Sequence, residues 1–417
     1  MMIEWKSFLL GDVIEYANGS SFPNRFQGLK QKKYDFYKVS DMNNPKNFMY
    51  MVEAENTVDD EIVEKLKAKV HPKDTVIFPK VGAALLTNKR RILSKPSLFD
   101  NNIMGIKPKK ELLPLYLYYF MLTIDFAKYV QSGAVPSINK TIIDNIPINL
   151  PSLPEQRKIA AILSSVDEAI EKTETIIEQT EKVKKGLMQQ LLTKGIGHTK
   201  FKKTEIGEIP EKWEVKKIGE IASVEYGISE SVSSNTDPSI GIPILTGANI
   251  TLDGTLDLSK LVYIEKKQQE RFQLKKGDLL FNWRSGSQHH VGKTAIFNLD
   301  GDYTYASFIL RIRLNEDSHN EFYYYLLNYL KSIDYFIKNT SMQVNFKLNA
   351  SSFKELLVVK PTLEEQIRIS KIISSVDKKI QKEKNRLNQL QTIKQGLMQV
   401  LLTGKVRVKV DDEVVSS

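Results

Sequence analysis

The chain contains no cysteine in its 417 residues, which excludes disulfide bonds, thiolate metal sites and a cysteine nucleophile. It has no run of about 18 apolar residues, so we expect no membrane-spanning helix. Its first residues, MMIEWKSFLLGD, lack the pattern of a secretory signal peptide. Histidine is scarce, with five residues. The adjacent pair His289-His290 lacks the i, i+4 spacing of a helical zinc site, so we expect no metal centre.

Catalytic motifs are missing as well. The sequence contains no HExxH, GxSxG or EF-hand pattern, and it lacks both the glycine-rich loop after a strand and the [ND]PP[YF] signature of methyl transfer. Residues 286–294 (GSQHHVGKT) end like a phosphate-binding loop. However, five residues separate the two glycines instead of four, and a strand-like run follows instead of a helix. We therefore expect a binding protein with no catalytic residue.

One long segment occurs twice, 210 residues apart. Residues 153–193 read LPEQRKIAAILSSVDEAIEKTETIIEQTEKVKKGLMQQLLT, and residues 363–403 read LEEQIRISKIISSVDKKIQKEKNRLNQLQTIKQGLMQVLLT. They align without a gap, and 20 of the 41 positions are identical. The chain is therefore two units, each ending in the same segment.

Both copies of this segment have a helical heptad pattern. An apolar period of 3.5 residues with charged flanks predicts a coiled-coil seam. About 38 helical residues would make a rod of about 57 Å. The apolar positions of the predicted seam are Ile159, Leu163, Val166, Ile170, Ile177, Leu187 and Leu191 in the first copy, and Ile369, Ile373, Val376, Ile380, Leu387, Leu390, Leu397 and Leu401 in the second.

Two arrangements of these helices are open. They can form an oligomerisation coil between chains, or the two copies can pair within one chain. Polar residues interrupt both seams at matched places, Thr173 with Glu383 and Lys184 with Lys394. Such interruptions suit two short helices better than a long homodimer, so we expect an intramolecular, antiparallel pair with a pseudo-twofold repeat.

The overall composition is that of a globular protein with more than one domain. A chain of 417 residues is too long for one ordinary core. Its hydrophobic content of 41% and aromatic content of 9% are typical globular values. The net charge of +10 permits nucleic-acid binding through neutralisation of phosphates, although many soluble proteins are modestly basic.

Outside the helices the two halves share a faint frame. Each opens with a tryptophan, Trp5 or Trp213, before a short amphipathic helix. Residues 73–78 (KDTVIF) match residues 276–281 (KGDLLF), and a basic residue and a glycine follow, Lys80 and Gly82 in the first half and Arg284 and Gly286 in the second. Aromatic helices are predicted at 113–130 and 321–338, with their rings in the core. Two similar frames with different surface residues are typical of a protein that reads a two-part target.

Together these features resemble the specificity subunit of Type I restriction–modification systems. The resemblance covers essentially the whole chain. It rests on LPEQRKIAAILSSVDEAI and LEEQIRISKIISSVDKKI, on GLMQQLLT and GLMQVLLT, and on the order variable domain, helix, variable domain, helix. The segment GDLLFNWRSG is also typical of the family's recognition domains, whereas the first half reads DTVIFPKVGA there.

The resemblance implies an α+β fold, with two mixed α/β target-recognition domains separated by two long antiparallel helices that form an intramolecular coiled coil. It places recognition domains at 1–150 and 205–360, helical spacers at 151–196 and 361–404, and a C-terminal tail at 405–417. In that family each variable domain reads one half of a split double-stranded DNA site. The helices set the spacing and dock two methyltransferase subunits, and motor–nuclease subunits join them. The S-adenosylmethionine, ATP and Mg sites belong to those partners, so the resemblance implies a cytoplasmic, non-catalytic chain without a cofactor of its own.

Polar residues in the loops after the predicted strands are the candidate DNA contacts, because Arg, Lys, Asn and Gln read base edges and Lys and Arg hold phosphates. These candidates are Lys80, Lys89, Arg90, Arg91, Asn101 and Asn102 in the first half, and Arg284, Ser285, Gln288, His289, His290 and Lys293 in the second. A solvated loop is the competing interpretation for each residue. Two other functions stay open for the whole chain: a nucleotide-binding enzyme of the GKT type, and a coiled-coil scaffold that binds other proteins.

Overall fold

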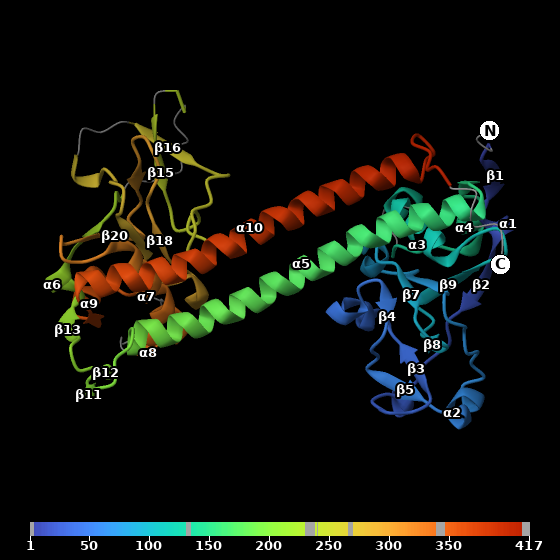
Figure 1. Ribbon diagram of the computed structural model, residues 1–417, viewed down its shortest axis with the longest axis horizontal. Coiled ribbons are helices and arrows are strands. Elements are labelled where there is room, and N and C mark those ends of the chain that lie inside the picture. The colour runs from blue at the N-terminus through green and yellow to red at the C-terminus, as the bar shows by residue number, and fades with distance from the viewer. Residues whose placement is uncertain are drawn as a thin grey trace. The chain divides into compact units, whose positions relative to one another are not determined.

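The computed structural model in Figure 1 describes residues 4–130, 135–229, 238–239, 241–265, 270–338 and 347–410. The chain divides into unit 1, residues 1–174 and 385–417, and unit 2, residues 175–384. The two long segments are helices α5 (Leu153–Lys194) and α10 (Leu363–Leu401), and the division falls inside both. Each unit is therefore a mixed α/β domain with a part of each long helix, and this agrees with the fold class predicted from the sequence.

Unit 1 is built from short strands and helices. Its strands are β1 (Lys6–Leu9), β2 (Ile14–Asn18), β3 (Tyr34–Tyr37), β4 (Tyr50–Met51), β5 (Asn56–Val58), β6 (Val76–Pro79), β7 (Arg91–Leu93), β8 (Ser97–Phe99), β9 (Ile103–Pro108) and β10 (Pro147–Leu150). Its short helices are α1 (Leu10–Val13), α2 (Asp60–Lys65), α3 (Pro114–Thr123) and α4 (Lys140–Asp144). The sheets have the strand orders β1-β10, β2-β9-β6-β7-β4 and β5-β3-β8. The β1-β10 pair brings the start of the domain against the strand that leads into α5.

Unit 2 repeats this order of elements. Its strands are β11 (Phe201–Thr204), β12 (Gly207–Pro210), β13 (Glu214–Lys217), β14 (Ala222–Tyr226), β15 (Gly241–Leu245), β16 (Val262–Glu265), β17 (Leu279–Asn282), β18 (Thr294–Ile296), β19 (Thr304–Tyr305), β20 (Ile309–Leu314) and β21 (Leu357–Lys360). Its short helices are α6 (Ile218–Ile221), α7 (Asn320–Ser332), α8 (Tyr335–Lys338) and α9 (Ala350–Lys354).

The strand orders of three sheets correspond between the two units. The orders β13-β21, β14-β20-β17-β18 and β16-β15-β19 of unit 2 correspond to β1-β10, β2-β9-β6-β7 and β5-β3-β8 of unit 1. The pair β3-β8 of unit 1 is parallel, and so is the corresponding pair β15-β19 of unit 2. Strand β4 is added in unit 1 and the hairpin β11-β12 in unit 2. The frame that the sequence shows faintly is thus a complete shared fold.

The aromatic helices α3 and α7 lie in the two main cores, as predicted. Their continuous length was predicted wrongly. Helix α3 ends at Thr123 because Asp125 accepts a hydrogen bond from the backbone of Ala127 and starts a separate 3-10 turn. Helix α7 ends at Ser332, and Asp334 then takes a left-handed backbone conformation with φ of 59° before α8 begins.

A glutamate at the start of each long helix holds the opening tryptophan of the same unit. Trp5 Nε1 donates to Glu155 Oε2 over 3.3 Å in unit 1, and Trp213 Nε1 donates to Glu365 Oε2 over 2.9 Å in unit 2. In unit 1 Arg407 Nε also donates to Glu155 Oε1, at 2.8 Å. Burial would raise the pKa of Glu155, but the hydrogen bonds and charge of Arg407 outweigh it and hold the pKa below its ordinary value.

The next residue, a glutamine in both copies, caps the aromatic helix. Gln156 Oε1 accepts from the backbone N–H of Leu113, the N-cap of α3, at 2.9 Å. Gln366 Oε1 accepts from the backbone N–H of His319, the N-cap of α7, at 2.8 Å. Each amide nitrogen also donates to the proline carbonyl five residues before it. The repeated Glu-Gln pair therefore ties the long helix to two other elements of its unit.

An aspartate further along α5 joins three elements of unit 1. Asp167 is only 2% exposed. It accepts a hydrogen bond from Tyr119 Oη of α3 at 2.8 Å, and Lys394 Nζ of α10 lies 2.6 Å from its Oδ1. Burial and the neighbouring carboxylate raise the pKa of Tyr119, so its hydroxyl stays protonated as a donor. Because Glu155 contacts Arg407 while Asp167 contacts Lys394, α5 and the segment that contains α10 run antiparallel here.

Unit 2 contains the same triad with the helices exchanged. Asp377 of α10 accepts from Tyr325 Oη of α7 at 2.8 Å, and Lys184 Nζ of α5 lies 2.5 Å from Asp377 Oδ1. The ion pair of Glu181 with Lys384 shows that the helices are antiparallel here too. The predicted intramolecular, antiparallel pairing is confirmed. The lysines that interrupt the two seams are the partners of buried or half-buried aspartates.

The apolar seam is most deeply buried where the helices enter the domain cores. Ile159, Leu163 and Leu401 belong to the core of unit 1, and Leu191, Ile369 and Ile373 belong to the core of unit 2. Two further seam residues, Ile170 and Ile380, are 3% and 7% exposed. Half-buried seam residues are Val166, Ile177, Leu187, Val376, Leu387, Leu390 and Leu397.

Charging the seam should destabilise the protein. We expect Ile170→Asp to lower the free energy of unfolding by about 3 kcal/mol or more, because it places an unpaired carboxylate at a site that is 3% exposed. The matched control is Ile176→Asp on the same helix, where the side chain is 36% exposed and the cost should be near 0.5 kcal/mol, about the usual size for a surface change. Urea unfolding followed by circular dichroism measures both, and equal stabilities would contradict a buried seam.

Removing the cation of a triad should cost more than removing an exposed lysine. Lys394→Met leaves Asp167 buried without its partner, and we expect a loss of about 3–5 kcal/mol. The double variant with Asp167→Asn should recover most of that loss, because the uncompensated charge is gone. Lys182→Met is the control, since Lys182 pairs with exposed Glu178. If thermal unfolding gave the same shift for Lys394→Met and Lys182→Met, the triad would not hold the domain on the helices.

Candidate nucleic-acid interface

In unit 1 the predicted contact loops meet at one edge of the larger sheet. The loop that follows β6 is tied on both sides, because Lys80 N–H donates to Asn102 O and Ile138 N–H donates to Lys80 O, each over 2.9 Å. The next residue, Val81, forms a bridge with Ser137. We call residues 80–91, 100–102 and 136–138 the loop edge of unit 1.

Unit 2 has the matching edge, residues 283–293, 306–308 and 347–348, which we call the loop edge of unit 2. Trp283 N–H donates to Phe308 O at 3.2 Å, and Leu348 N–H donates to Trp283 O at 2.9 Å. Arg284 forms the bridge with Lys347. By these bonds Trp283 is the equivalent of Lys80 in unit 1, and Arg284 is the equivalent of Val81. The sequence comparison, which set Lys80 beside Arg284, was wrong by one position, and one position reverses the side of a strand to which a side chain points.

Arg90 has a structural role, and its burial argues against the predicted DNA contact. It is fully buried. Its guanidinium donates to the carbonyls of Lys89 and Ile124 at 3.1 and 3.2 Å and lies 4.1 Å from the ring centre of Phe126. Burial lowers the pKa of Arg90 to about 9. A side chain used in this way cannot reach a base edge.

The other candidates of unit 1 are accessible to different degrees. Arg91 is half-buried and donates to Met42 O at 2.9 Å. Lys89 is half-buried, and its ammonium contacts the side chain of Asn43. Of the remaining candidates of unit 1, Asn101 and Asn102 are exposed and Lys80 is half-buried.

Lys293 is also a structural residue. It is 4% exposed, and its ammonium donates to the carbonyls of Gly247 (2.8 Å) and Ile250. Burial, and to a smaller extent the charge of Lys331, lower the pKa of Lys293. These contacts argue against the prediction of Lys293 as a DNA contact, because its ammonium holds the 247–250 segment.

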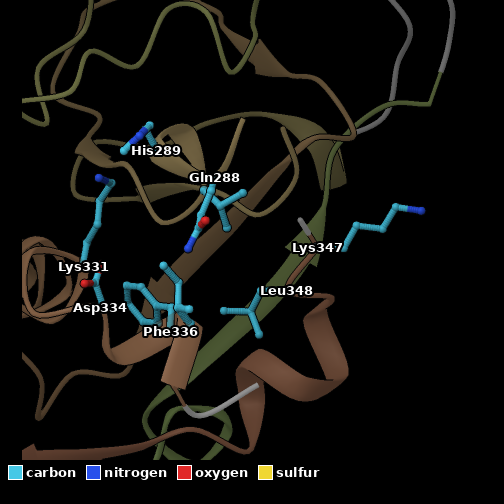
Figure 2. Close-up of a pocket in the computed structure, with 9 residues that line it drawn as sticks. Gln288, His289, Lys331, Asp334, Phe336, Lys347 and Leu348 are labelled. Carbon is cyan, nitrogen blue, oxygen red and sulfur yellow. The ribbon is translucent and has the colours of Figure 1, made fainter. Parts of the chain in front are cut away.

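A pocket of 240 Å³ opens beside the loop edge of unit 2. Figure 2 shows the side chains of His289, Gln288 and Lys331 gathered around it, with Phe336 below and Lys347 extending away from the group. Gln288 and His289 are exposed, whereas Ser285 and His290 are half-buried. Burial and nearby cations lower the pKa of His290, so this histidine favours the neutral form.

Arg284 lies beside an aromatic ring on the loop edge of unit 2. Its guanidinium carbon lies 4.9 Å from the ring centre of Phe308, whose side chain is 48% exposed. Trp283 ties the loop to the neighbouring segment, because its indole N–H donates to Ser307 O at 2.6 Å. Sequence reasoning missed Phe308, Lys331 and Lys347. The three residues come from distant parts of the chain, so no local pattern marked them.

Within the residues that the structure describes, no group of three or more His, Cys, Asp or Glu side chains could hold a metal ion. In the same part of the chain no helix is long and apolar enough to cross a membrane.

The Type I restriction modification DNA specificity domain matches this chain twice, at residues 2–182 and 210–392. The chain belongs to this family. Each match covers one loop edge and part of the long helix that follows it. The family's role is DNA recognition, and its presence in both halves disfavours the scaffold interpretation.

The chain is also similar in sequence to named specificity subunits. The Type I restriction enzyme MjaVIII specificity subunit of Methanocaldococcus jannaschii is 32% identical over 339 residues, which cover 76% of each chain. The EcoKI specificity subunit of Escherichia coli K12 is 23% identical over 82% of this chain and 76% of the relative. Both relatives are named as specificity subunits of Type I restriction enzymes.

Solved structures show the same fold. The S subunit of a Type I restriction–modification system from M. genitalium superimposes with a TM-score of 0.59, at 15% identity over 96% of each chain. A chain from a study of complex assembly and conformational transition of the Type I system gives 0.59, at 16% identity, over 97% of this chain and all of the other.

The two buried cations should affect stability rather than surface chemistry. We expect Lys293→Ala to lower the free energy of unfolding by about 1–3 kcal/mol, because it leaves the carbonyls of Gly247 and Ile250 without their donor. His289→Ala, on the same loop but exposed, should change stability by no more than about 0.5 kcal/mol. Thermal unfolding compares the two variants, and an unchanged melting temperature for Lys293→Ala would show that its ammonium is not structural.

Proposed function

We propose that this chain is the DNA-recognition subunit of a Type I restriction–modification complex, and that each unit reads one half of a two-part DNA site. One observation carries the proposal. Two equal frames present different side chains at matched positions, Val81 and Asn102 on the loop edge of unit 1 and Arg284 and Phe308 on that of unit 2. Each base pair shows its own donor and acceptor pattern in the major groove, so different side chains select different bases.

The contacts at the loop edges are proposals at the level of single residues. In unit 1 we assign base contacts to Asn101 and Asn102, and phosphate contact to Lys80. In unit 2 we assign base contacts to Arg284 and Gln288. The remaining exposed or half-buried polar candidates, which we assign to the rim of the interface, are Lys89, Arg91, Ser285, His289 and His290.

We also propose that α5 and α10 determine the distance between the two half-sites. In each unit the glutamate, the glutamine and the triad fix the recognition domain to both long helices. A recognition domain that is fixed to a helix moves with that helix. The number of residues between the two sets of contacts then determines the DNA spacer.

The partners of the chain follow from the same proposal. Two methyltransferase subunits would dock on the helical spacers, and motor–nuclease subunits would complete the restriction complex. S-adenosylmethionine, ATP and Mg would bind to those subunits. The names of the relatives, which are specificity subunits of restriction enzymes, support this division of labour.

Lengthening both helices together should lengthen the preferred DNA spacer. Duplicating residues 174–180 in α5 and residues 384–390 in α10 keeps the heptad phase and leaves Asp167–Lys394 and Lys184–Asp377 able to form. One heptad adds about 10 Å, so we expect the same half-sites about three base pairs further apart. Selection from a duplex library with variable spacers measures this shift.

The matched control is the same duplication in α5 alone. The two ion pairs can then no longer both form in one antiparallel register, so two-part recognition should be lost at every spacer length. An unchanged DNA spacer for the double duplication would contradict the proposal that α5 and α10 determine the distance between the half-sites. The loss of all two-part binding by that variant would also contradict it.

A further inference from the structure

We propose that Arg284, held by the ring of Phe308, is the guanine-reading residue of unit 2. This inference rests on the proposed function and narrows it to one side chain and one base. An arginine fork can donate two parallel hydrogen bonds to N7 and O6 of guanine, and no other base presents that pair of acceptors at the major-groove edge.

The loop that carries Arg284 is held on several sides. The side-chain amide of Asn282 donates to His290 O at 2.8 Å, and the backbone carbonyl of Asn282 accepts from Gly292 N–H at 2.8 Å, so both ends of the 283–292 loop are joined. Trp283 is fixed by the Ser307 carbonyl at 2.6 Å. A side chain on such a support loses little conformational freedom when it binds, and this favours direct reading over adaptable contact.

The ring of Phe308 restricts the side chain itself. The guanidinium carbon lies 4.9 Å from the ring centre, within the range of a cation–π contact. Phe308 is 48% exposed and Arg284 is half-buried, so this contact lies at the accessible surface of the loop edge. The N–H groups of an arginine point outward in that plane. We infer that the guanidinium stacks on this ring, an arrangement that would leave its N–H groups clear for the edge of a base.

Unit 1 cannot read in this way at the equivalent position. Val81 takes the place of Arg284 and Asn102 takes the place of Phe308, as the backbone bonds show. Valine has no donor, and asparagine pairs best with adenine. The guanine preference from this position should therefore occur in one half-site only.

The test selects duplexes from a library randomised in both half-sites, using the full-length chain with the methyltransferase subunits that co-purify with it. Wild-type protein should select guanine at one position of the half-site read by unit 2. Arg284→Ala should lose about 5- to 150-fold of that preference, which corresponds to one bidentate base contact. Arg284→Lys keeps the charge but not the fork, so it should retain overall affinity and lose the preference.

Phe308 is tested as a positioning residue. Phe308→Ala should weaken the guanine preference more than it weakens overall affinity, and Phe308→Tyr should restore the preference because the ring remains. The control is Arg271→Ala, because Arg271 stacks on Phe272 at 5.2 Å in the same unit but faces Glu225. That variant should leave every base preference unchanged.

Several results would overturn the assignment. Arg284→Ala with all wild-type preferences intact would do so, and so would a wild type that selects no guanine in either half-site. Arg284→Ala could instead lower affinity equally for all sequences and reduce the slope of log affinity against log salt concentration by about one. That result would make Arg284 a phosphate contact. A wild type without any sequence preference would instead refute the proposed function itself.

Discussion

The structure depends on a buried carboxylate whose charge must be compensated. Asp167 is 2% exposed, so its charge is stable only with the ammonium of Lys394 and the hydroxyl of Tyr119 beside it. The three residues come from α5, α10 and the recognition domain of unit 1. Removing any one of them leaves the other two incompletely paired in a buried place, and the second triad does the same in unit 2. Each recognition domain is thereby fixed to two antiparallel helices at a defined height along them.

This arrangement separates the part of the chain that must stay alike from the part that must differ. The residues that make the contacts with the helices are identical in the two repeats: Glu155 and Glu365, Gln156 and Gln366, Asp167 and Asp377, and Lys184 and Lys394. The residues at the loop edges are different at matched positions. A shared frame with different readers is what a two-part DNA target requires, since each half needs its own pattern of donors and acceptors.

The helices, their seam and the domain order could be predicted because they depend on periodicity and on self-similarity within one chain. The aromatic core followed from composition, but its helix boundaries did not, since Asp125 and Asp334 change the backbone locally. The candidate site was harder. A loop rich in Lys and Arg does not show which cations turn inward, and Arg90 and Lys293 satisfy buried carbonyls instead of facing solvent. The partner of Arg284, Phe308, lies 24 residues away and becomes its neighbour only through strand pairing.

The central claim is that two separately placed readers are carried on one pair of helices. The most direct measurement is a hydroxyl-radical footprint of the full-length chain, with its co-purifying subunits, on a DNA site selected by that complex. The account predicts that Asn101→Ala with Asn102→Ala weakens protection of one half-site alone, and that Gln288→Ala weakens protection of the other half-site alone. Loss of protection over both half-sites from either set of changes would contradict two separate readers.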